Sequence, residues 1–146
     1  AVTNVQGPLM DLKNEFPERV SLMNFTENLA DLFKRADLHV LPSIWQDPSP
    51  NVVLEAKRFG VPTVGFDVGG VAELVEHKVD GYICGEVTHQ SLSSAIEWVV
   101  SDQVRLLNMK DAASLNFVSN FGYERFQEKW LHIVSKSRQN NGATTR

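Results

Sequence analysis

Apolar residues along the chain follow helix-like and strand-like patterns in alternation. Positions 29, 32, 33 and 36 repeat with the period of a helix, and Thr26 stands where a helix N-cap belongs. The run LHVLP at 38–42 is short, continuously apolar and ended by proline, which predicts a buried strand. A helix over 50–59, stopped by Gly60, then leads to the apolar run PTVGF at 62–66. The expected order is therefore helix, strand, helix, strand.

The alternation continues in the second half of the chain. The glycine pair at 69–70 leads into a short helix, and the Asp-Gly pair at 80–81 turns the chain into the apolar segment YIC. Thr88 is expected to cap a further helix. Phe126 and Trp130 fit the apolar stripe of a last helix, so we expect them in the core. Weaker strand candidates are the segments 2–5 and 19–23.

Alternating strands and helices with short connections predict an α/β fold, a Rossmann-like three-layer domain whose parallel sheet is covered on both faces. We assign residues 1–135 to this domain. From position 136 onward the sequence has no apolar face, which predicts a disordered tail over 136–146. Ligands of such sheets bind outside the carboxyl ends of the strands, so the segment 43–50 lies on the expected functional edge.

Composition narrows the function. The chain has 146 residues and a net charge of −4 without a run of Lys or Arg, which argues against nucleic-acid binding. A reducing, cytoplasmic compartment suits the single cysteine, Cys84, which is expected to be a small buried residue at a strand end. The histidines at 39, 77, 89 and 132 lack metal-ligand spacing. We therefore expect no metal and no cofactor.

The segment QDPSPNVVLE, residues 46–55, is the main candidate site. If its helix begins at Pro50 with Ser49 as N-cap, the amides of residues 51–53 are free at the positive end of the helix and can bind phosphate. Asp47 precedes this end and Glu55 lies about 7.5 Å along the helix axis. Two carboxylates around an anion site suit a nucleotide sugar. An ordinary loop and cap, with Glu55 paired to Arg58, explains the same residues.

Residues 36–84 closely resemble the donor-binding, carboxyl-terminal half of GT-B glycosyltransferases, in particular the retaining family 4 (glycosyl transferases group 1). The resemblance rests on the order of several features rather than on one motif. These are Pro42-Ser43, the eight-residue spacing from Asp47 to Glu55, Glu55-Ala56, Gly60-x-Pro62, Asp67-x-Gly69-Gly70, Glu73 and Asp80-Gly81. The resemblance implies transfer of a sugar from a nucleotide-sugar donor, as in polysaccharide biosynthesis.

The resemblance also implies roles for individual residues. Glu55 would hold the ribose hydroxyls, and Asp47, the catalytic candidate, would contact the transferred sugar. The backbone of Ser49, Pro50, Asn51, Val52 and Val53 would meet the sugar and the diphosphate. Gly69 and Gly70 either approach the ligand closely or form a tight turn without ligand contact. Glu73 is expected to be an acid in the first turn of its helix, and residues 23–25 would lie against the base.

The sequence departs from the family pattern in three places. Asp47 replaces the commoner Glu, and Pro48 replaces a glycine, which removes one amide. Residues 1–20 lack the strand–helix unit whose Arg and Lys neutralise the diphosphate. We therefore expect most of a carboxyl-terminal domain, without that unit and without the amino-terminal acceptor domain, and no sugar transfer by this segment alone.

Several features of the complete protein stay open at this point. The acceptor, a glycan or a lipid-linked glycan, is unknown, and the complete protein could be peripheral to a membrane. Two alternatives to a transferase also remain. One is a non-catalytic domain that binds a nucleotide or a partner protein, and the other is a sugar-nucleotide epimerase with the same fold.

Overall fold

The computed structural model describes residues 7–23 and 28–141, with side chains described up to residue 136. Its sheet consists of three parallel strands, β1 (His39–Leu41), β2 (Thr63–Phe66) and β3 (Gly81–Cys84), in the order β1-β2-β3. The register pairs Val40 with Val64 and Val64 with Tyr82. The expected parallel sheet is thus confirmed, and all three strands end at the same edge.

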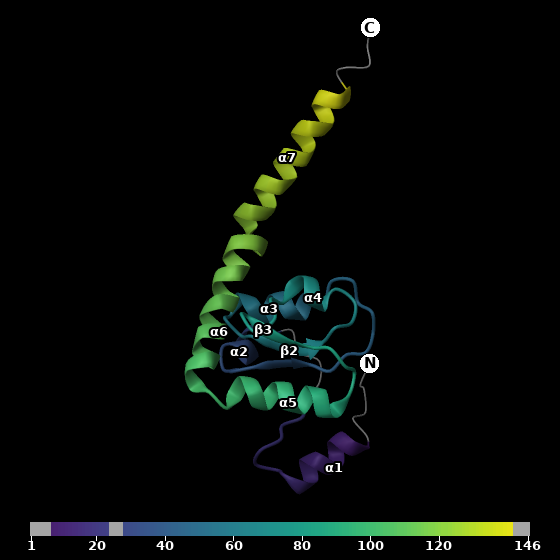
Figure 1. The fold of residues 1–146 in the computed structure, drawn as a ribbon, viewed down its shortest axis with the longest axis vertical. Coiled ribbons are helices and arrows are strands. Elements are labelled where there is room, and N and C mark those ends of the chain that lie inside the picture. Colours follow the sequence, from purple (N-terminus) through teal and green to yellow (C-terminus); the bar gives the residue numbers. More distant parts are fainter. Residues whose placement is uncertain (1–6, 24–27, 142–146) are drawn as a thin grey trace.

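Helices cover both faces of the sheet, which gives the expected three layers (Figure 1). Helices α3 and α4 lie on one face and α5 lies on the other. In chain order the helices are α1 (Pro8–Glu15), α2 (Leu29–Phe33), α3 (Asn51–Arg58), α4 (Val71–Leu74), α5 (His89–Val100), α6 (Gln103–Asn116), the π-helix η1 (Phe117–Phe121) and α7 (Tyr123–Asn141).

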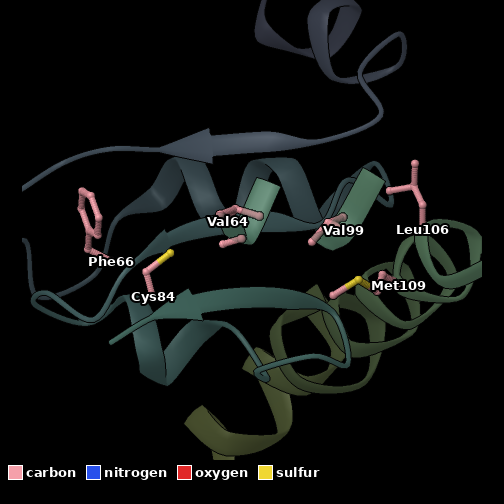
Figure 2. Close-up of a cluster of buried hydrophobic side chains, with 7 residues drawn as sticks. Val64, Phe66, Cys84, Val99, Leu106 and Met109 are labelled. Carbon is pink, nitrogen blue, oxygen red and sulfur yellow. The ribbon is translucent and has the colours of Figure 1, made fainter. Parts of the chain in front are cut away.

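The central strand β2 organises the core because all four of its residues are buried. Its side chains alternate between the two faces of the sheet. Val64 and Phe66 point toward α5 and α6, where they meet Cys84 (Figure 2). Ala95, Val99, Leu106 and Met109 complete this cluster, and each is at least 95% buried. Cys84 is therefore the buried residue at a strand end that the sequence predicts.

Helix ends agree with the sequence where a side chain or a glycine defines them. Thr88 Oγ1 accepts a hydrogen bond from the Ser91 amide at 3.1 Å and caps α5. At the end of α3, Gly60 has φ 67°, its amide donates to the Lys57 carbonyl at 2.9 Å, and the Val61 amide donates to the Ala56 carbonyl at 3.0 Å. This pair of bonds is a Schellman motif, in which glycine is favoured because φ is positive.

The amino-terminal region differs from the prediction. Residues 20–23 have no regular structure, so the strand expected at 19–23 is wrong. Helix α1 forms instead at 8–15 with Pro8 at its first turn, and none of its residues is buried. An apolar run becomes a strand only where another strand pairs with it, and the described residues supply none here. The segment 2–5 and Thr26 lie outside the described residues.

The carboxyl-terminal helix also differs from the prediction. Helix α7 extends away from the domain and continues to Asn141, so residues 136–141 are helical rather than disordered (Figure 1). Phe126 and Trp130 are 62% and 58% exposed, which corrects their expected place in the core. Periodicity identifies the apolar face of a helix but not the element that covers it. Residues 142–146 lie outside the described residues.

None of the helices in the described part of the chain is both long enough and apolar enough to cross a membrane.

Candidate functional site

Two loops meet at the carboxyl edge of the sheet. The first, residues 42–50, connects β1 to α3, and the second, residues 67–70, connects β2 to α4. The Gly70 amide donates a 2.8 Å hydrogen bond to the Asp47 carbonyl, which joins the loops through their backbones. The structure therefore brings together Asp47 and the glycine pair, which lie more than twenty positions apart in the sequence.

The contact between the two loops leaves no room for a side chain at Gly69 or Gly70. A Cβ at Gly69 would lie 2.3 Å from the Asp47 carbonyl oxygen, and one at Gly70 would lie 2.0 Å from that of Pro48. Gly69 also has φ 60°, a conformation that side chains disfavour. A tight contact between loops accounts for both glycines without a ligand.

The start of α3 differs from the prediction by one residue. Pro50 is the N-cap, with φ −66° and ψ 99°, and the helix begins at Asn51. Ser49 is not the cap, and no side chain caps this helix end. The Ser49 amide donates to Asp47 Oδ1 at 2.9 Å. Such an Asx turn holds the chain extended before the helix. Asp47 therefore has a structural role besides any role in binding.

Two amides at the start of α3 remain available to a ligand. Those of Asn51 and Val52 donate to no other residue within the described ranges, whereas the Val53 amide donates to the Pro50 carbonyl at 3.0 Å. The side chain of Val53 is fully buried and that of Val52 is half-buried, so these residues could meet a ligand only through their backbones. The positive end of the helix dipole lies at the same place.

Glu55 is exposed on α3, in its second turn. The alternative in which it pairs with Arg58 is not observed, because Glu55 forms no ion pair with any residue that the structure describes. Asp47 is likewise exposed, so carboxylates flank the start of α3 on either side. Trp45, which is 81% exposed, presents an indole ring on the same loop as Asp47.

The edge of the sheet is acidic. Asp47, Glu55, Asp67 and Glu73 contribute carboxylates, and neither segment 43–55 nor segment 67–73 contains a Lys or Arg. Glu73 lies in the first turn of α4, as expected, and is exposed. A diphosphate at this edge would have only the amides at the start of α3 and outside cations to balance its charge.

Metal binding receives no support from the described residues, which contain no group of three or more metal-ligating side chains. His39 packs edge-on against Phe33 with its ring 5.8 Å away, and its Nδ1 lies 3.1 Å from Thr63 Oγ1. Burial lowers the pKa of His39 to about 4, so its ring is neutral at physiological pH. This histidine is a half-buried packing residue of the edge strand β1, as its position within a strand suggests.

Sequence reasoning missed a buried ion pair. Lys57 is 2% exposed and Asp80 is 1% exposed, and Lys57 Nζ lies 2.7 Å from Asp80 Oδ2. The sequence suggests only a turn at Asp80. A signal was nevertheless present, because Lys57 stands four positions after Val53 and three before Gly60, on the face of α3 that points into the core.

Of the remaining candidate positions, Met23 is exposed in a loop, while residues 24 and 25 of the proposed base contact lie outside the described residues.

Comparison with known proteins identifies the family. The model of the family "Glycosyl transferases group 1" matches residues 9–115, which is most of the chain. The protein therefore belongs to the group 1 glycosyltransferases.

Relatives agree with this assignment. An uncharacterized glycosyltransferase of Haemophilus influenzae is 27% identical over 82% of this chain and 34% of its own length. The UDP-Gal:alpha-D-GlcNAc-diphosphoundecaprenol alpha-1,3-galactosyltransferase of Escherichia coli is 29% identical over 78% of this chain and 30% of its own. The chain thus spans about a third of the length of these relatives.

A solved structure supports the fold. Anabaena HepE in complex with UDP matches with a TM-score of 0.77 and 23% identity, covering 88% of this chain and 36% of HepE. HepE has also been solved with UDP-glucose. The arrangement of strands and helices is thus that of the GT-B glycosyltransferases.

Proposed function

We propose that this chain provides the nucleotide-sugar site of a retaining, family 4 type glycosyltransferase, as a large part of its carboxyl-terminal domain. The observation that carries the proposal is the exposed start of α3, where two unengaged amides lie between Asp47 and Glu55. Membership of the group 1 family supports it, and so does the UDP-glucose complex of the structurally similar HepE. Neither the non-catalytic binding domain nor the epimerase is favoured by these comparisons.

The described geometry narrows the proposed roles. Glu55 accepts hydrogen bonds from the ribose hydroxyls, Asp47 contacts the transferred sugar, and the amides of Asn51 and Val52 meet the diphosphate. Ser49 and Val53 contribute less than their sequence positions suggest, because their amides are already engaged, and Pro50 has no amide. The backbone of Gly69 and Gly70 supports the site by holding the Asp47 loop in place.

Because this edge of the sheet is acidic, the rest of the enzyme supplies the positive charge that the diphosphate needs. Basic groups for the diphosphate and the surface for a glycan or lipid-linked glycan acceptor come from parts beyond these residues, including an amino-terminal GT-B domain. No metal takes part. The physical contribution of this segment is to orient the donor and to stabilise the leaving nucleoside diphosphate through the helix end. Alone it binds the donor but transfers no sugar.

Titration of the 146-residue chain with UDP and UDP-glucose, followed by NMR shifts of the backbone amides, tests the proposal. Shifts should concentrate on residues 47–55, and Glu55→Ala should weaken UDP binding by about 10-fold or more, as for a lost hydrogen bond to a charged group. Glu73→Ala is the matched control, since it removes an exposed acid from the same edge and should leave the affinity unchanged.

Equal affinity of a folded Glu55→Ala chain and its parent would contradict the ribose role. Conversion of UDP-glucose without an acceptor would indicate an epimerase instead. Sugar transfer by the isolated chain would refute the proposal that this segment binds the donor but needs the rest of the enzyme for transfer.

A further inference from the structure

The side chain of Lys57 is enclosed in the core, and its positive charge therefore needs a partner that compensates it. Burial of an unpaired ammonium is strongly unfavourable, so such groups are retained with partners. Here Nζ donates to Asp80 Oδ2 at 2.7 Å and to the Leu74 carbonyl, and it lies 5.8 Å from the centre of the Phe121 ring. The ammonium group of Lys57 thus donates hydrogen bonds to a carboxylate and a backbone carbonyl that lie outside α3.

The partners of Lys57 belong to the element that the glycine pair opens. Leu74 is the last residue of α4, and Asp80 Oδ1 accepts from the Glu76 amide at 2.9 Å in the segment that follows α4. Lys57 therefore fixes the carboxyl-terminal end of α4, and its positive charge lies at the negative end of that short helix.

The opposite end of α4 is fixed to the same part of the chain. Gly70, the N-cap of α4, donates to the Asp47 carbonyl in the loop that leads into α3. Helix α4 is thus held at one end by the loop before α3 and at the other end by a side chain of α3. Between these points Val53 packs with Val71 and Leu74 in one buried cluster. Helices α3 and α4 consequently form a single unit.

This unit carries the proposed donor-binding groups. Glu55 precedes Lys57 by two residues, so the two side chains point in directions about 200° apart around α3. A rotation of α3 that displaced Lys57 from Asp80 would move Glu55 and the amides of residues 51–52 by a comparable angle.

The buried Lys57–Asp80 ion pair suggests a role other than stability. Replacing such a pair by apolar residues of similar volume is often neutral or stabilising, so stability alone does not account for it. Hydrogen bonds have a preferred direction, which apolar contacts lack. We propose that Lys57, held by Asp80, is a positioning residue that fixes α3 and α4 in the orientation that the donor site needs. This inference rests on the proposed function.

The test uses the double variant Lys57→Met/Asp80→Leu in the 146-residue chain, because it removes both charges together and leaves neither buried alone. The matched control is Lys110→Met, which removes another Lys–Asp pair, with Asp37 at 3.0 Å, on a more exposed part of the fold. Hydrogen exchange at the Gly70 amide and the affinity for UDP are measured in each folded chain.

We expect the double variant to unfold at nearly the parent temperature, while exchange of the Gly70 amide accelerates at least about 10-fold and UDP affinity falls about 10-fold. Lys110→Met should change neither quantity. Parental exchange and parental affinity in the double variant would overturn the inference. If the double variant does not fold, Lys57→Gln/Asp80→Asn replaces it, since it also removes both charges and keeps an acceptor for the Glu76 amide.

The exchange measurement needs no ligand, so it separates this inference from the proposed function. If the parent chain binds no UDP, the proposed function fails while the Gly70 exchange still decides whether Lys57 positions the two helices. If UDP binds the parent and the double variant equally, with unchanged exchange, only the positioning role fails.

Discussion

Individual residues in this protein show how burial decides chemistry. The sequence places His39 among the apolar residues of a strand, and burial beside Phe33 lowers its pKa to about 4. Lys57 looks like an ordinary helix-surface residue, yet it is one of the most buried side chains that the structure describes. In both cases the residue type is visible in the sequence, whereas the degree of burial is decided by tertiary packing.

The neutral state of His39 predicts a dependence of stability on pH. The unfolded chain binds a proton near pH 6.5 and the folded chain only near pH 4, so the unfolded state holds more protons between these values. Stability is therefore fully present above pH 6.5 and decreases as pH falls toward 4, by up to about 3 kcal/mol from this group.

Urea unfolding at several pH values measures this loss. A His39→Gln chain should lose less stability than the parent over the same interval, and His89→Gln, which changes an exposed histidine, should behave as the parent does. Identical pH profiles for His39→Gln and the parent would contradict the prediction.

At the scale of elements, the contact between the two loops determines the geometry of the site. The sequence places Asp47 and the glycine pair each after a buried strand, and parallel strands end at one edge. Their proximity was therefore predictable. The one-residue shift of the helix start was not, because it depends on the Asx turn that Asp47 forms with the Ser49 amide and on the hydrogen bond from Gly70.

Gly70→Ala tests this loop contact. The added methyl would lie 2.0 Å from the Pro48 carbonyl oxygen, so the loops must separate, and we expect a loss of about 1–3 kcal/mol in unfolding free energy together with weaker UDP binding. Gly85→Ala is the control, since a Cβ there meets nothing within 4 Å. Chemical denaturation compares the three chains, and equal stability of Gly70→Ala and the parent would be inconsistent with the contact.

At the scale of the whole molecule, α7 is an amphipathic helix whose apolar face is not covered by another described part of the chain. Its described side chains, residues 123–136, are exposed or half-buried, and α7 makes its main contacts with the adjacent η1. Apolar exposure of this kind is typical of a surface that another body covers. The helix itself therefore contributes little to the stability of the α/β domain.

Removal of residues 123–146 should change the unfolding free energy of the domain by less than about 1 kcal/mol, because no described side chain of α7 is buried. Thermal unfolding of the shortened chain measures this. Removal of the more deeply packed α6, from residue 103 onward, provides the contrast, since it deletes Leu106 and Met109 from the main core and should prevent folding. A large loss after removal of α7 alone would show that it packs on the domain.

The sequence by itself determined the order of strands and helices, the parallel sheet and the edge that carries Asp47 and Glu55. These follow from local periodicity, from proline and glycine at the ends of elements, and from a family resemblance that the group 1 match supports. Tertiary structure alone decided that Lys57 is paired inside the core, that Pro50 rather than Ser49 is the N-cap of α3, and that Phe126 and Trp130 are exposed. Each of these depends on which groups meet across long stretches of chain or on which faces remain uncovered, and a one-dimensional pattern specifies neither.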